Sequence, residues 1–257
     1  MMPRSFKSLF YISIFSFTLA ACAPGGFQSS SVKLPDDPTN EPASNNSGQA
    51  VTNPSTGTAD TTTSVVTTPS TGTSAEAKVL AKYSYVDPTK MIPSGQLTTA
   101  LLYFDANLAK IKNQDYLSVI DFRQFSGNKR FYIINMKTGE VWAIRVAHGK
   151  GSDPDHDGYA NSFSNVSGSN ASSVGFYMTS TTYDGSHGYS LSLDGLSSTN
   201  SNVRSRAIVV HGADYVSEAD VIQGRSWGCP AVAMENRTKL IDMIKNGSII
   251  YASATEN

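Results

Sequence analysis

Residues 207–217 read AIVVHGADYVS, and residues 224–232 read GRSWGCPAV. The first stretch begins with four apolar residues, which is typical of a short buried strand, and continues into His211. The second stretch places Cys229 between a glycine and a proline, and these two residue types indicate a tight turn. We therefore expect a histidine at the end of a strand and a thiol in a turn with an unusual backbone shape.

Short β-type segments make up most of the chain around these two stretches. We expect strands at residues 116–122, 130–135, 141–146, 174–178, 189–193, 207–210 and 248–251. Residues 137–140 read KTGE and are typical of a hairpin turn between two of these strands. Helical spacing indicates only two helices, one from Ser94 or Thr98 to Leu108 and one over residues 235–245. The predicted fold class is mainly β (α+β), a β-sandwich or open barrel with a few peripheral helices.

Composition divides the chain into a leader, a linker and one domain. Residues 28–75 are rich in Ser, Thr, Asn, Gly and Pro, and such a segment buries too little apolar surface to fold. We predict a tether over residues 22–76 and a single globular domain over residues 77–257. The formal net charge is −1 and no basic stripe is present, so a nucleic-acid partner is not expected.

The first 22 residues indicate export and a lipid anchor. A short basic region precedes an apolar stretch at residues 9–21, which is shorter than the roughly 20 residues that a membrane-spanning helix needs. Residues 1–21 therefore read as a signal peptide, and Leu19-Ala20-Ala21 followed by Cys22 resembles the bacterial lipobox. Lipidation at Cys22 would anchor the chain to a membrane. Because Cys22 is not followed by aspartate, we expect an outer-membrane lipoprotein that faces the periplasm. An ordinary signal peptide is the alternative.

Lipidation of Cys22 would leave Cys229 as the one thiol of the mature chain. An odd cysteine in an exported protein indicates an intermolecular disulfide or a reactive thiol, and a buried inert cysteine is the other possibility. A thiol becomes a nucleophile when a base such as His211 activates it, and glycine beside it exposes amides to a developing oxyanion. The alternative for His211 is a structural histidine.

The pattern His211-Gly212 followed by Ser226-Trp227-Gly228-Cys229 resembles the signature of the L,D-transpeptidase (YkuD-type) catalytic domain. Further similar segments cover residues 147–151, 163–165, 172–177 and 188–196, so the resemblance spans most of residues 80–253. It implies a YkuD-like barrel of mixed sheets, with Cys229 as nucleophile and His211 as general base. It also implies that the backbone amide of Cys229, with a neighbour such as Gly228, forms the oxyanion hole. No cofactor is expected.

The resemblance also implies a substrate, the stem peptides of peptidoglycan. The thiolate would attack the carbonyl between the third residue and the terminal D-alanine of a tetrapeptide, and release D-alanine. A neighbouring amine would then form a 3→3 cross-link, whereas water would give the tripeptide product of an L,D-carboxypeptidase. A non-catalytic murein-binding lipoprotein is the alternative from another class. We expect a monomer.

Substrate-binding residues are expected around the thiol. Many family members have a basic or amide residue two positions after the cysteine, but here that residue is Ala231. Arg225 is the candidate for the missing cation, because a guanidinium suits a carboxylate or carbonyl, and a structural ion pair is its alternative. The other candidates for substrate contact are Ser226, Trp227, His148, His187 and Tyr215.

No metal site is expected. The four histidines and Cys229 lack the spacing of a known zinc motif. Asp153, Asp155 and Asp157 match the first half of a calcium loop, but the twelfth position is Ser164 in place of glutamate. The sequence therefore favours an acidic surface turn.

Overall fold

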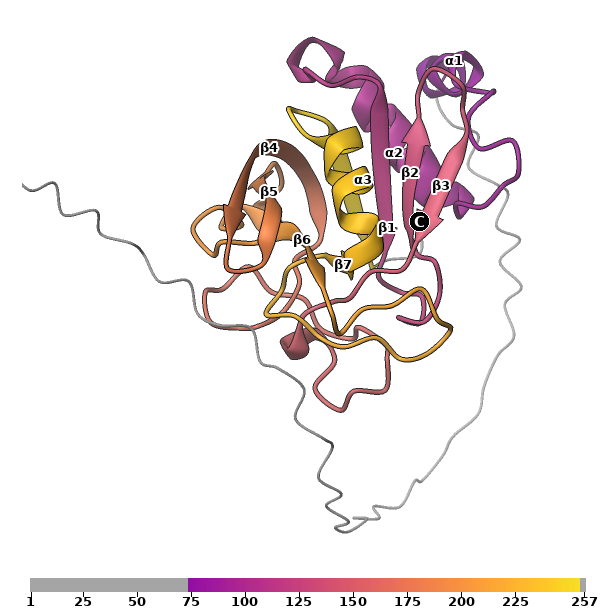
Figure 1. Ribbon diagram of the computed structural model, residues 1–257. Helices are drawn as coiled ribbons and strands as arrows, with labels where there is room; N and C mark the ends of the chain where they lie inside the picture. The colour runs from indigo at the N-terminus through magenta and orange to yellow at the C-terminus, as the bar shows by residue number, and fades with distance from the viewer. Residues whose placement is uncertain (1–73, 255–257) are drawn as a thin grey trace, which may run out of the picture. The chain divides into compact units, whose positions relative to one another are not determined.

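The computed structural model describes residues 74–254, which contain a single sheet of eight strands (Figure 1). The strands lie in the order β3-β2-β1-β8-β4-β5-β6-β7. Their bounds are β1 Tyr116–Asp121, β2 Phe131–Asn135, β3 Val141–Ile144, β4 Gly175–Gly185, β5 Gly188–Gly195, β6 Val209–Ala213, β7 Ala231–Ala233 and β8 Ile249–Ser253. The α-helices of this part are α1 Ser74–Lys82, α2 Ser94–Ala106 and α3 Met234–Ile244.

The sheet is mixed and curls into a nearly closed barrel. Strand β1 runs parallel to β8 and β6 runs parallel to β7, while the other neighbours are antiparallel. The two edge strands come close to each other, because Ala147, just after β3, forms a bridge with Ala231 at the start of β7. This architecture confirms the predicted mainly β fold of the open-barrel type with peripheral helices.

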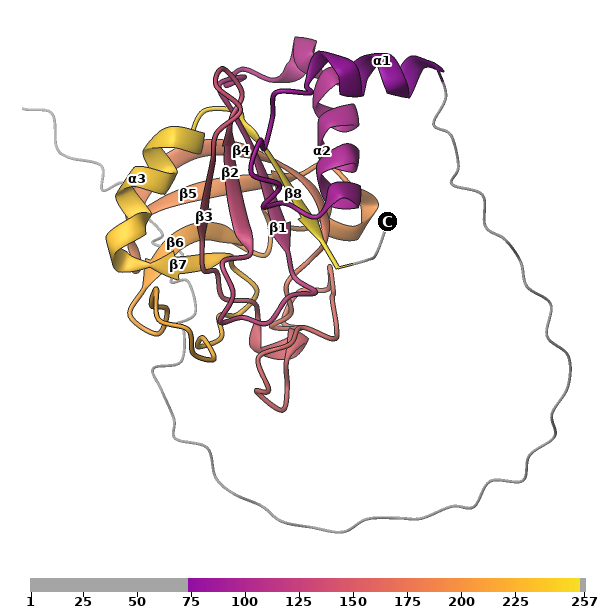
Figure 2. The same cartoon turned by 90° about the vertical axis from the view of Figure 1, so that its right-hand side faces the viewer.

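Side chains of β1 alternate between two hydrophobic clusters, as expected for a strand with both faces covered. Ile120 lies in the cluster inside the barrel, whereas Leu117 and Val119 lie in the cluster under α2. Figure 2 shows α2 beside β1 and β8, and α3 beside β5, β6 and β7. The apolar face of α3, with Leu240, Ile241 and Ile244, joins the cluster inside the barrel.

Some element boundaries differ from the predicted ones. Helix α1 begins at Ser74, inside the predicted tether. Strand β6 begins at Val209, because Ala207 has a positive φ of 55°, and it continues through His211. His211 therefore lies within a strand and not after it. Strand β7 was not predicted, since it has only three residues and follows a proline.

The leader, Cys22 and most of the predicted tether fall in residues 1–73, which lie outside the described residues. Among residues 74–254, none of the helices has the length and apolar character needed to cross a membrane.

Candidate active site

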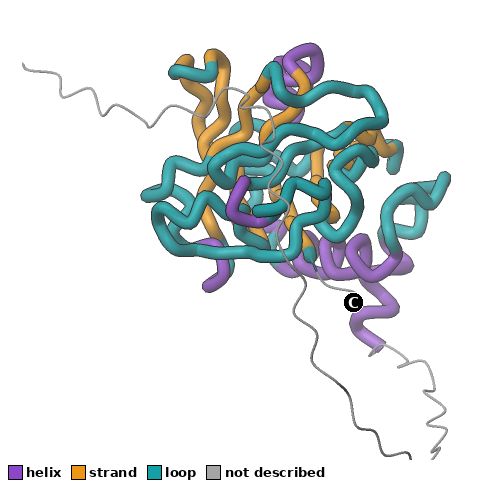
Figure 3. Tube along the Cα trace, turned by 90° about the horizontal axis from the view of Figure 1, so that it is seen from below, coloured by secondary structure: helices purple, strands orange, loops and turns teal. Residues whose placement is uncertain are grey.

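The parallel pairing of β6 and β7 brings the two predicted catalytic residues onto adjoining segments. His211 pairs with Ala231 in the register of these strands, and Cys229 lies two residues before Ala231. The sulfur of Cys229 lies 3.5 Å from the backbone nitrogen of Val209, which is two residues before His211. Since alternate residues of a strand share a face, Val209 and His211 point to the same side of β6. Figure 3 shows that loops cover most of the face that points downward in Figure 1.

His211 is buried in a way that fixes its tautomer. Its Nδ1 lies 3.0 Å from the carbonyl oxygen of Gly212. A carbonyl only accepts, so Nδ1 carries the proton and Nε2 keeps its lone pair. Burial lowers the pKa of His211 to about 4, and the neighbouring His187, whose ring stacks on that of His211 at 4.3 Å, also lowers it. At neutral pH the imidazole is therefore uncharged and able to accept a proton.

Ser226 stabilises the thiol-bearing turn, residues 226–229. Its hydroxyl donates to the carbonyl of Cys229 at 2.7 Å and accepts from the amide of Gly228 at 3.0 Å. Ser226 is fully buried and both of these contacts serve the turn, so its expected contact with substrate stays an untested prediction. The amide hydrogen of Gly228 is engaged within the turn, which favours the amide of Cys229 over that of Gly228 for the predicted oxyanion hole.

Gly228 is required by both its conformation and its surroundings. Its φ is +118°, a value that residues with a side chain rarely adopt. A Cβ at this position would lie 2.7 Å from the carbonyl oxygen of Ala171 and 3.0 Å from Ile208. The residue before the thiol must therefore be glycine for the turn to keep this shape.

His148 belongs to a buried polar network and not to the substrate surface. Its Nδ1 lies 2.8 Å from a guanidinium nitrogen of Arg130, and its Nε2 lies 2.9 Å from the carboxylate of Asp153. Because a guanidinium only donates, Nδ1 accepts and Nε2 donates. Burial, followed by the charge of Arg130, lowers the pKa of His148 to about 4. His148 is 1% exposed, so its contacts support a structural role, and its expected contact with substrate stays an untested prediction.

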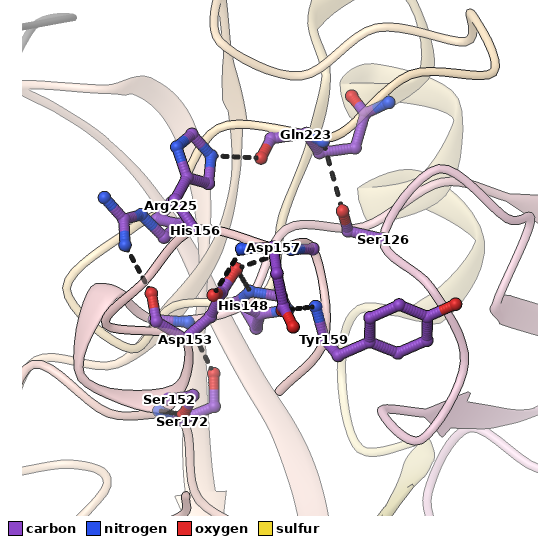
Figure 4. Close-up of polar contacts among 12 residues, drawn as sticks. Ser126, His148, Ser152, Asp153, His156, Asp157, Tyr159, Ser172, Gln223 and Arg225 are labelled. Atoms are coloured by element: carbon purple, nitrogen blue, oxygen red, sulfur yellow. Dashed lines mark hydrogen bonds and ion pairs between the residues drawn. The ribbon is translucent and has the colours of Figure 1, made fainter. Parts of the chain in front are cut away.

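The acidic turn is attached to this network, as Figure 4 shows. The carboxylate of Asp153 also accepts from the amides of Asp157 and Gly158, both at 3.1 Å. Ligand atoms of Asp153, Asp155 and Asp157 lie within 4.8 Å of one another, but the carboxylate of Asp153 already serves the fold. These contacts fit the predicted acidic surface turn, in which Asp155 and Asp157 are exposed.

Arg225 is tied to the same turn. One of its guanidinium nitrogens donates to the backbone carbonyl of Asp153 (Figure 4). Arg225 is half-buried and forms no ion pair within residues 74–254. The contact supports a structural role for Arg225, although the partner is a carbonyl and not the carboxylate that an ion pair requires.

The remaining predicted substrate contacts lie at the surface of the site. His187 stacks on His211, and Trp227 is half-buried within the thiol-bearing turn. Tyr215 packs with a small apolar cluster, and its carbonyl accepts from the amide of Gly224 at 2.8 Å. These three residues remain candidates for substrate contact.

Two residues near the thiol escaped the sequence-based reasoning. The hydroxyl of Ser172 accepts from the amide of Gly149 at 3.0 Å and donates to the carbonyl of Gly228 at 3.3 Å. Ser172 therefore links the thiol-bearing turn to the segment after β3. Arg206 reaches across from the segment before β6 and donates to residues 164–173. The similar segment at residues 172–177 pointed toward Ser172, but no motif marked Arg206.

The described residues thus combine a nearly closed barrel, a histidine within a strand and a thiol after a glycine in a turn. The family described as L,D-transpeptidase catalytic domain matches residues 89–253. The chain therefore belongs to the L,D-transpeptidase catalytic domain family, which confirms the resemblance seen in the sequence. No curated protein matches the chain.

Solved structures of related folds are only distantly similar. The L,D-transpeptidase from Mycobacterium smegmatis is 14% identical, with a TM-score of 0.35, and the match covers 55% of this chain and 59% of that one. The helical cell shape determining protein Pgp2 from Campylobacter jejuni is 13% identical, with a TM-score of 0.35 and coverages of 56% and 49%. An L,D-transpeptidase from Xylanimonas cellulosilytica is 18% identical, with a TM-score of 0.31 and coverages of 53% and 59%. The chain thus spans less than two thirds of the length of each of these structures.

Proposed function

We propose that this chain is a cysteine L,D-transpeptidase that acts on the tetrapeptide stems of peptidoglycan through an acyl-enzyme at Cys229. The observation that carries the proposal is the state of His211 beside the thiol-bearing segment. Its Nδ1 is held by the carbonyl of Gly212, and its lowered pKa, about 4, leaves Nε2 as a base at neutral pH. Membership of the L,D-transpeptidase family supports the substrate class.

The first half of the reaction forms the acyl-enzyme. The thiol of Cys229 gives its proton to Nε2 of His211, and the sulfur attacks the carbonyl carbon between the third residue and the terminal D-alanine. The amide of Cys229 stabilises the oxyanion of the tetrahedral intermediate. When the C–N bond breaks, the imidazolium of His211 returns the proton to the leaving amine of D-alanine, and a thioester remains.

The second half transfers the acyl group. An amine from a neighbouring stem attacks the thioester carbonyl, gives up a proton to His211 and displaces the sulfur, which forms a 3→3 cross-link. Water in place of the amine gives a tripeptide. Trp227, His187 and Tyr215 are the proposed substrate contacts, since they lie around His211 and the thiol-bearing turn without being fully buried.

The proposed setting is the periplasmic face of the outer membrane. A lipid on Cys22 would anchor a monomeric domain, and residues 22–73 would tether it within reach of murein. Labelling cells with a radioactive fatty acid tests this part directly. The label should enter the parent chain and be lost from a Cys22→Ser variant, and equal labelling of both would refute the anchor.

Incubation of the purified chain with disaccharide-tetrapeptides tests the activity. The parent should convert them into cross-linked dimers, and Cys229→Ala should give none, because the variant lacks the atom that carries the acyl group. His211→Gln should slow the reaction by about 10²–10⁴-fold, the usual contribution of a general base. Tripeptides in place of dimers would identify a carboxypeptidase, and identical products from the parent and Cys229→Ala would reduce the chain to a murein binder.

A further inference from the structure

Arg206 donates four hydrogen bonds to residues 164–173, the segment that packs against the thiol-bearing turn. One terminal nitrogen donates to the carbonyl of Ser164 at 2.7 Å and the hydroxyl of Ser173 at 2.9 Å. The other donates to the carbonyl of Ala171 at 2.6 Å and the hydroxyl of Ser169 at 3.3 Å. All four acceptors are neutral oxygens, so the positive charge of Arg206 is solvated by the chain but not neutralised by it.

Arg206 and Arg204, two residues earlier, carry the same charge but differ in their partners. Arg204 is exposed and makes two contacts of 2.8 Å with the carboxylate of Asp194. Arg206 is half-buried, and no aspartate or glutamate within residues 74–254 forms an ion pair with it. Partial burial of a cation carries a desolvation cost, and an anion beside Arg206 would offset that cost.

The guanidinium of Arg206 lies beside the turn that carries Cys229, whose thiolate would be an anion. A Cβ placed on Gly228 would lie 3.2 Å from a terminal nitrogen of Arg206, so the guanidinium stands against the residue that precedes the thiol. Burial lowers the pKa of Arg206, while negative charge on Tyr177 and on Cys229 would raise it, so the sulfur lies within electrostatic range. A guanidinium stays protonated throughout the working pH range of a protein.

Three titratable side chains around the sulfur, those of His211, Tyr177 and Tyr183, are held in their neutral forms by burial. Burial lowers the pKa of His211 to about 4 and raises that of Tyr177 to about 12. Burial also raises the pKa of Tyr183, which lies on β4 and feels the charge of Cys229. His187 faces the site through its stack on His211.

We propose that Arg206 is a positioning residue that stabilises the thiolate of Cys229 and at the same time fixes residues 164–173 against the thiol-bearing turn. The inference rests on the proposed role of Cys229. The position two residues after the thiol is Ala231 and supplies no cation. The proposal gives that role to Arg206, which lies 23 positions before Cys229. Proton transfer to His211 then ends in a thiolate next to a permanent positive charge.

The pH dependence of alkylation by iodoacetamide tests the proposal on the full chain, followed by mass spectrometry of the peptide that contains Cys229. The thiolate displaces iodide, so the rate follows the fraction of thiolate. In the parent, the inflection should lie below the ordinary thiol value of about 8.5. Arg206→Gln should move it upward by about one pH unit or more, because loss of a nearby opposite charge raises the pKa of a thiol. Arg204→Gln is the matched control and should leave it in place.

Arg206→Lys separates charge from hydrogen bonding. It keeps the charge but loses most of the four contacts, so its inflection should stay nearer to that of the parent than to that of Arg206→Gln. Equal shifts in the two variants, or no shift in either, would overturn the assignment. A parent inflection at or above about 8.5 would overturn it even if both variants failed to fold. Alkylation needs no stem peptide, so a chain that reacts as expected but leaves tetrapeptides intact would refute the proposed function alone.

Discussion

Gly228 shows how one residue sets the geometry of the thiol. Its φ of +118° is rarely adopted by residues with a side chain, and a Cβ at this position would collide with the carbonyl of Ala171. We expect Gly228→Ala to cost about 1–3 kcal/mol of stability from backbone strain alone, and to displace Cys229. Chemical denaturation together with the tetrapeptide assay measures both effects.

Gly168→Ala is the control for this prediction. Gly168 also has a positive φ, of 77°, but nothing lies within 4 Å of the position that its Cβ would take. Its replacement should leave activity unchanged and cost less stability than Gly228→Ala. Comparable losses of activity in both variants would contradict the account of the turn.

Residue types made His211 and Cys229 easier to single out as candidates than the residues that surround them. His211 and Cys229 were recognisable because few residue types can supply a base and a nucleophile. The contacts of His148 and Arg206 depend on partners distant in the sequence, such as Arg130 for His148 and Ala171 for Arg206. Their burial and hydrogen bonds could not be read from composition or spacing.

At the scale of elements, α3 packs against the paired strands β6 and β7. Leu240 is fully buried on its apolar face, inside the barrel cluster. Leu240→Ala should cost about 2–5 kcal/mol of unfolding free energy, because it leaves a cavity in a packed core. Thr238→Ala, on the exposed side of the same helix, is the control and should cost less than Leu240→Ala. A loss below about 1 kcal/mol in Leu240→Ala, or equal losses in both variants, would argue against this packing.

Strands with strong apolar runs were predicted close to their observed bounds, and short or distorted ones were not. The predicted strand at residues 116–122 ends one residue later than β1, and the one at 248–251 overlaps β8. The left-handed backbone at Ala207 and the three-residue length of β7 left no periodic signal. Register between β6 and β7, which brings the thiol beside the histidine strand, follows from closure of the whole barrel.

At the scale of the whole molecule, buried neutral histidines link stability to pH. The pKa values of His148 and His211 fall to about 4 in the folded chain, against about 6.5 when unfolded. Between these values the unfolded chain binds more protons, so stability is full above about pH 6.5 and falls as the pH drops toward 4. Denaturation of the parent at several pH values should show this loss, and His211→Gln should show a shallower one. A flat profile for the parent would contradict the buried neutral state.

The central claim is that Cys229 carries the acyl group of the stem peptide. Acid-quenched reactions with a tetrapeptide, analysed by mass spectrometry, test it most directly. We predict an adduct on the peptide that contains Cys229, equal in mass to the stem without its terminal D-alanine, and its accumulation when no acceptor amine is supplied. Release of D-alanine at the parent rate by Cys229→Ala, or an adduct on any other residue, would contradict the claim.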